Sequence, residues 1–138
     1  MKHTVFTLLL LISSVNFAQD KCDKTMVENL FQEKLSESRK NEMQHQKRYE
    51  KAVSKLAVIN DWDKKAELAY LSKILTAPSY QQSLKAKHTI LKEVVSLLSK
   101  IDKQATVNNC KVSTSIQDML HNVIQKNSTE WNKLIETV

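Results

Sequence analysis

The sequence predicts an all-α protein, folded as an elongated antiparallel helical bundle with one disulfide. The 138 residues include no glycine and a single proline, Pro78. Tight turns and β-hairpins usually need glycine for positive backbone dihedral angles, so its absence argues against a sheet. In addition, apolar residues recur three and four positions apart over several long stretches, which is the spacing of one helix face.

Residues 1–18 are predicted to be a secretory signal peptide. A short basic start, an apolar run over residues 5–12 and a polar patch lead to Ala18, the expected cleavage site. The apolar run is too short to span a bilayer, so we expect no stable membrane anchor. Residues 19–138 are then expected to form a single all-helical domain. It would be exported to a bacterial periplasm or the extracellular space, or secreted if the source is eukaryotic.

The chain has two cysteines, Cys22 and Cys110. An even pair in an exported protein predicts one disulfide. The bridge would close a loop of about 88 residues, which contributes on the order of 4 kcal/mol in the chain-entropy model.

Residues 23–59 contain no helix breaker. One apolar stripe centres on Leu30 and another on Val53, with a polar stretch over residues 36–48 between them. Strong helix formers in that stretch favour one helix of about 37 residues. The alternative is two helices joined near Asn41.

The next helix is expected from about Trp62 to Thr76, with the turn at Asn60 and Asp61 supplying its N-cap. Pro78 then breaks or kinks the chain. Ser79 and Gln82 have the spacing of a capping box.

A long amphipathic helix is expected over Tyr80–Ala105. Its apolar stripe is interrupted once, by His88, which predicts that this histidine faces the core. Residues 106–112 are expected to be a loop. The last helix would begin near Thr114, at another capping-box pattern, and run to Val138.

A disulfide between the start of the first helix and the start of the last places both starts at one end of the molecule. An up-down-up-down four-helix bundle does not satisfy this condition. Three long antiparallel rods satisfy it, with the middle rod kinked at Pro78, and so do five shorter helices with breaks near Asn41 and at Pro78. We prefer the three rods, because nothing breaks the first helix.

In the three-rod arrangement the last helix is too short to cover the far end of the first. An apolar, aromatic surface would remain there, and such surfaces commonly bind a partner or a second copy of the chain. The residues predicted to form it are Tyr49, Val53, Leu56, Ile59, Trp62 and Tyr70.

No catalytic motif is present. Without glycine there is no P-loop, no dinucleotide fingerprint and no nucleophile elbow, and we expect no cofactor. Met43 with His45 and Met119 with His121 have ligand types that suit copper(I), but residues two apart on a helix point in different directions. The weak candidates that remain are Glu33, His88 and His121, which fall at similar heights in the three-rod arrangement. A hydrogen-bonded core histidine is the plainer interpretation of His88.

The sequence therefore predicts an exported, non-enzymatic protein that binds another protein, as an inhibitor, an immunity factor or a chaperone-like partner. A homodimer through the same surface is a further expectation. The alternative is a carrier of a small apolar ligand or a metal ion. The formal net charge is +6, but acidic residues are interspersed with the basic ones, so we expect no nucleic-acid partner.

Overall fold

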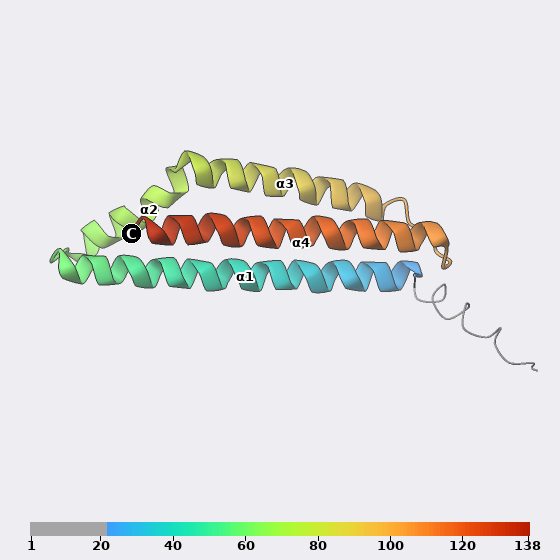
Figure 1. The fold of residues 1–138 in the computed structure, drawn as a ribbon, viewed down its shortest axis with the longest axis horizontal. Coiled ribbons are helices and arrows are strands. Elements are labelled where there is room, and N and C mark those ends of the chain that lie inside the picture. The colour runs from blue at the N-terminus through green and yellow to red at the C-terminus, as the bar shows by residue number, and fades with distance from the viewer. Residues whose placement is uncertain (1–21) are drawn as a thin grey trace, which may run out of the picture.

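The computed structural model describes residues 22–138, which fold into four helices and contain no strand. The all-α bundle predicted from the sequence is confirmed. Figure 1 shows an elongated molecule in which α1 and α4 lie along each other and α3 lies on the other side of α4. The predicted signal peptide, residues 1–18, lies outside the described residues.

Helix α1 is a single helix, Lys24–Ile59, of 36 residues, or about 54 Å at 1.5 Å per residue. Asp23 caps its start, since a carboxylate oxygen accepts the Met26 backbone N–H at 2.8 Å. The polar stretch in its middle does not interrupt it. The single first rod is therefore the arrangement adopted, and the break near Asn41 does not occur.

The turn after α1 depends on a residue with a left-handed backbone. Asp61 has φ 55°, a conformation that aspartate tolerates better than most side chains. The Trp62 N–H then reaches back to the Ala57 carbonyl at 2.9 Å, and the Asp61 N–H to Val58 at 3.3 Å. This pair of bonds is a Schellman motif, in which the residue after the left-handed one packs back on the helix.

Helix α2, Lys64–Thr76, begins two residues later than predicted, and its N-cap is Asp63 rather than the Asn60–Asp61 turn. Helix α3, Pro78–Leu98, begins at the proline itself, with Ala77 as N-cap and no side-chain cap. The expected capping box at Ser79 is therefore wrong. Proline suits the first helical position because it has no N–H to satisfy there.

The end of α3 and the start of α4 also differ from the prediction. Helix α3 stops at Leu98 instead of Ala105, and α4, Val107–Glu136, includes most of the expected loop over residues 106–112. The reason lies in Asn109. Its buried side chain accepts the Asp102 N–H at 3.1 Å and donates to the Asp102 and Gln104 carbonyls, both at 3.0 Å. The Asn109 side chain thus provides hydrogen-bond partners for the backbone of the turn just before α4. Asn109 itself lies in the helix and not in a loop.

Helices α1 and α4 run parallel, and the rod made of α2 and α3 returns antiparallel to both (Figure 1). The predicted disulfide joins Cys22 to Cys110 at the end where α1 and α4 start, with 5.1 Å between their Cα atoms. The rods therefore have the three-rod topology, with the middle rod broken at Pro78.

The core is divided into two apolar clusters along the long axis. The cluster near the disulfide contains Val27, Val94, Ile101, Ile116 and Leu120. The second, toward the α1–α2 turn, contains Tyr49, Val53 and Trp131, with side chains of α2 packed against them. Within residues 22–138 no helix is long and apolar enough to cross a bilayer.

Replacing both cysteines, Cys22→Ala with Cys110→Ala, should lower the free energy of unfolding by about 4 kcal/mol. The bridge spans 88 residues of sequence, and its removal restores loop entropy to the unfolded chain. Urea denaturation of the oxidised protein and the variant measures the difference. Reductant should destabilise only the original protein; equal stability of protein and variant would contradict the prediction.

Candidate functional site

Polar side chains occupy inward-facing positions in the middle of the bundle, between the two apolar clusters. In α3 the residues turned inward are spaced alternately three and four apart, as in a coiled coil. They are Tyr80, Ser83, Lys87, Ile90, Val94 and Leu97. Beside Ser83 and Lys87, α1 and α4 contribute Asn41, His45, Asn127 and Ser128, which are joined by hydrogen bonds. We call this level the polar layer.

The hydroxyl of Ser128 is the centre of the polar layer. His45 Nε2 and Asn41 Nδ2 each lie 3.1 Å from Ser128 Oγ. The Ser128 hydroxyl can in turn donate to the Ile124 carbonyl at 3.0 Å. Asn127 completes the set by donating from Nδ2 to Asn41 Oδ1 at 3.2 Å. These groups therefore satisfy one another across the α1–α4 interface.

The tautomer of His45 follows from its neighbours. A guanidinium nitrogen of Arg48 lies 3.4 Å from Nδ1, and guanidinium can only donate. Nδ1 is therefore the acceptor, and Nε2 carries the hydrogen that is donated to Ser128. Burial, and then the Arg48 charge, lower the pKa of His45 below its usual value, against an opposing effect of Glu42. Both causes favour the neutral ring.

The Ser128–His45 pair superficially resembles a nucleophile and its base, but its bonding does not fit that role. A general base must present an unprotonated nitrogen to the serine hydroxyl, whereas here Nε2 carries the hydrogen. Nor does any carboxylate orient Nδ1, since its partner is the Arg48 cation. The pair is a structural contact.

Glu42 lies beside the polar layer and links three helices. Its Oε1 accepts the Trp131 indole N–H at 3.1 Å. Its Oε2 is buried, has no hydrogen-bond partner among the described residues, and lies 3.8 Å from the Lys87 ammonium of α3. Burial first, and then the Glu42 charge, raise the pKa of Tyr80. Glu42 is thus an inward-facing charge with one oxygen incompletely satisfied.

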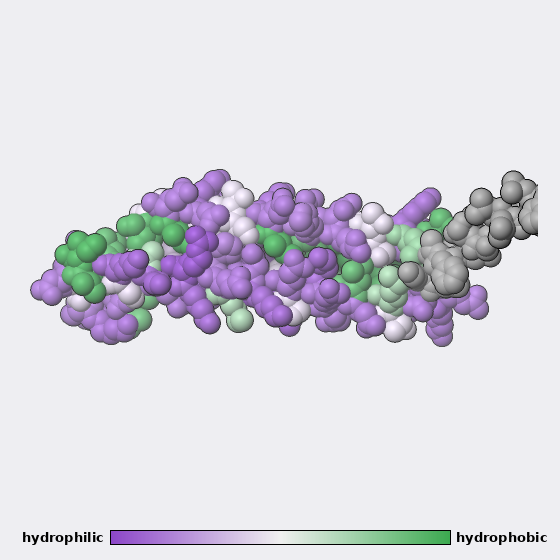
Figure 2. All heavy atoms as spheres, turned by 60° about the horizontal axis from the view of Figure 1, so that its bottom comes forward, coloured by the Kyte–Doolittle hydropathy of each residue, from purple (hydrophilic) through white to green (hydrophobic). Residues whose placement is uncertain are grey.

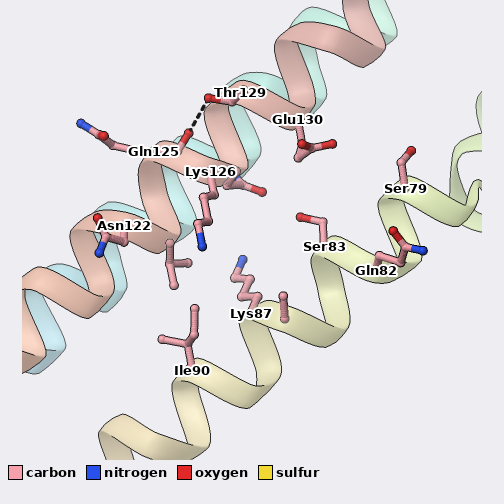
Figure 3. A pocket seen from close by; sticks show the side chains of 13 residues that line it. Ser79, Gln82, Ser83, Lys87, Ile90, Asn122, Gln125, Lys126, Thr129 and Glu130 are labelled. Carbon is pink, nitrogen blue, oxygen red and sulfur yellow. Dashed lines mark hydrogen bonds between the residues drawn. The ribbon is translucent and has the colours of Figure 1, made fainter.

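A groove of about 600 Å³ lies between α3 and α4 beside this layer. It exists because α3 turns small side chains toward α4 there, namely Ser79, Ser83 and Ala86. Figure 3 shows Lys87 and Lys126 extending into the groove from opposite helices, with Ile90 below and Glu130 beyond. We call this hollow the α3–α4 groove.

The predicted partner surface is only partly exposed. Tyr49 and Val53 are 7% and 0% exposed, because α2 and the end of α4 cover them, so their assignment to an exposed surface is wrong. Leu56 is half-buried, and Trp62 and Tyr70 are half-buried with ring centroids 5.1 Å apart. Ile59 is 79% exposed, as is Val58 beside it at 82%.

More apolar side chains are exposed along α2. Leu68 and Leu75 line a second groove, of about 420 Å³, whose floor includes Tyr49, Tyr80 and Trp131. In Figure 2 hydrophobic side chains gather at the end of the molecule where α1 and α2 meet. We call this end, with Val58, Ile59, Trp62, Leu68 and Leu75, the apolar tip.

The metal candidates Glu33, His88 and His121 are all exposed. The prediction that His88 faces the core is wrong, because α3 turns Lys87 inward and leaves Leu84, His88 and Val95 outside. Within residues 22–138 no group of three acidic, histidine or cysteine residues is placed to hold a metal ion.

Sequence reasoning did not predict the burial of His45 or the inward position of Glu42. The signal for His45 was its spacing, since it lies four residues after Asn41 and four before Tyr49 and so continues the buried face of α1. Nothing in the local sequence marks Glu42, whose partners Lys87 and Trp131 come from distant helices.

Comparisons of the chain with protein-family models, curated proteins and solved structures find no match.

Acidification should destabilise the protein through His45. Because its folded-state pKa is lowered, the stability that the neutral ring contributes is complete above the unfolded-state pKa of about 6.5 and declines as pH falls below it. His45→Gln keeps an amide donor for Ser128 but does not titrate. Between about pH 7.5 and about pH 5.5 the urea midpoint of this variant should therefore fall less than that of the original protein.

The matched control is His88→Gln, which makes the same substitution at an exposed histidine outside the polar layer. A His45→Gln protein that loses as much stability on acidification as the original would disprove the assignment of a neutral, Nε2-protonated His45.

Proposed function

We propose that this chain is an exported, non-enzymatic protein that binds another protein through the apolar tip. The observation that carries the proposal is the exposure of Val58 and Ile59, at 82% and 79%, on the last turn of α1. Large apolar side chains concentrated at one end of a rod are what a partner surface presents. An inhibitor, an immunity factor or a chaperone-like protein acts by such binding.

The structure of the tip supports this use. Helix α4 ends short of the α1–α2 turn (Figure 1), so the tip is supported by two helices only. The Schellman motif holds Trp62 back against the helix end, where its ring packs against that of Tyr70 at an interplanar angle of 39°. A rigid aromatic pair beside exposed aliphatic side chains is typical of interface hot spots. Burial of one such aliphatic side chain contributes about 1.5–3 kcal/mol.

The second groove would add specificity to this surface. Leu68 and Leu75 stand at its edge, both more than half exposed, while Tyr80 and Trp131 form part of its floor. An apolar side chain of the partner inserted between them would contact aromatic rings already held by the core. The partner would then contact both the exposed end of α1 and the second groove.

Two features favour export and a non-enzymatic role. The Cys22–Cys110 disulfide is the kind of bond that persists in an oxidising compartment. The buried polar groups that come nearest to a catalytic arrangement, Ser128 and His45, are engaged in mutual hydrogen bonds with the wrong tautomer for general-base chemistry. Binding is the activity that the remaining surface supports.

The double substitution Val58→Ser with Ile59→Ser should weaken binding to the partner at least tenfold, because it removes apolar contact area from the tip. The free energy of unfolding should change by less than about 1 kcal/mol, since both side chains are exposed. The measurement is capture from an extract of the source organism. The captured protein is then identified and purified, and its binding is titrated against each form of the chain.

Val95→Ser is the matched control, because Val95 is also more than half exposed but lies on α3, away from the tip. Sedimentation over a range of protein concentrations separates a second copy of the chain from a different protein as the partner. Binding that survives the tip substitutions while Val95→Ser abolishes it would refute the proposal.

A further inference from the structure

The α3–α4 groove brings two positive charges together from different helices. Lys87 comes from α3 and Lys126 from α4, and Figure 3 shows their ammonium groups directed toward each other across the hollow. Two like charges that face one another repel, and the repulsion is greater where the protein displaces water. An anion between them would convert this repulsion into two attractions.

Carboxylates of the chain neutralise one member of this pair. Lys87 forms an ion pair with Glu42 of α1, at 3.8 Å. Lys126 forms no ion pair with any described residue. Glu130 lies farther along the groove, but Lys133 pairs with it at 3.4 Å. The groove therefore keeps one ammonium group, that of Lys126, without a carboxylate partner among the described residues.

The lining of the groove also supplies neutral donors. The Ser83 hydroxyl points toward the two lysines, while Gln82 and Asn122 lie at the edges of the groove (Figure 3). In the described part of the chain none of the three has a hydrogen-bond partner. Amide and hydroxyl hydrogens next to ammonium groups are a suitable set of partners for phosphate or carboxylate oxygens.

One wall of the groove is apolar. Ala86 and Ile90 from α3 and Val123 from α4 line it beside Lys87. The volume of about 600 Å³ is within the range of sites for small organic molecules. The position of this wall next to the lysines favours a molecule with an anionic head and a short apolar part over a bare ion.

We propose that the α3–α4 groove binds a small amphipathic organic anion. Its phosphate or carboxylate group lies between Lys87 and Lys126, and its apolar part contacts Ala86, Ile90 and Val123. The site lies at the middle of the bundle, away from the apolar tip, and does not depend on protein binding by the tip. Occupancy would also fix α3 against α4, since each helix supplies one of the two lysines.

The test is a nuclear magnetic resonance titration of the isotope-labelled, disulfide-bonded protein. The probes are inorganic phosphate, acetate, hexyl phosphate and hexanoate, each at the same ionic strength. Saturable shifts should appear at groove residues, and each hexyl-chain probe should bind more tightly than its short counterpart. Comparison of the phosphate and carboxylate probes shows which head group the site prefers.

Lys126→Gln should weaken the binding of the preferred probe about fivefold, a loss expected for one partly exposed charged contact. Lys111→Gln is the matched control, because it removes the same charge from an exposed position of α4 outside the groove. Ser83→Leu, which fills the groove without changing charge, should abolish binding. Circular dichroism confirms that each variant is folded.

Four results would overturn the proposal. The first is the absence of saturable shifts with all four probes. The second is an equal loss of affinity in Lys126→Gln and Lys111→Gln, which would show attraction by net charge alone. The third is unchanged binding in a folded Ser83→Leu protein, which would place the probe elsewhere. Equal binding of acetate and hexanoate, and of the two phosphates, would refute the contribution of the apolar wall.

Discussion

The parallel alignment of α1 with α4 is the constraint on which the rest of this structure depends. The pairs that join the two helices include Cys22–Cys110, Asn41–Ser128 and Arg48–Asn132, and their sequence separations are 88, 87 and 84. A nearly constant separation means that the two helices advance together from one end to the other. The chain between them must then return along the full length of the molecule, and α2 and α3 are that return path.

The polar layer helps to fix this alignment, but it buries less hydrophobic surface than an apolar layer would. An apolar layer in the same place, however, would also fit when α1 and α4 slide past each other by a turn. Asn41, His45 and Ser128 can satisfy one another at one alignment only, and a shift would leave buried polar groups without partners. We infer that the layer exchanges some stability for a single register, as a buried asparagine does in coiled coils.

Both functional proposals follow from where this alignment leaves the surface. Because α4 starts ahead of α1 at the disulfide end and is also shorter, 30 residues against 36, the last turns of α1 extend beyond it. There Val58 and Ile59 stay exposed. Because the middle of the bundle is polar, α3 turns Ser83 and Lys87 toward α4 rather than large apolar residues. The α3–α4 groove results, and its two lysines face each other.

The sequence by itself determined the helical class and the disulfide, and it favoured the continuous first helix and the three-rod topology over a break near Asn41. The absence of glycine argues against a sheet, and strong helix propensity over residues 36–48 favours a continuous helix. A single pair of cysteines allows one disulfide within the chain. The break at Pro78 belongs with them, because proline acts on its own backbone and on that of the residue before it.

Only the tertiary structure decided which face of α3 is buried and where the loop before α4 ends. The stripe through Leu84, His88 and Val95 is as regular as the one through Ser83, Lys87 and Val94. The second faces inward because Val94 completes a cluster with Ile116 and Lys87 lies near Glu42. Asn109 likewise joins a helix because the turn five to seven residues before it uses its side chain. Periodicity shows that a helix has an apolar face, but the partners that compete for that face come from elsewhere in the chain.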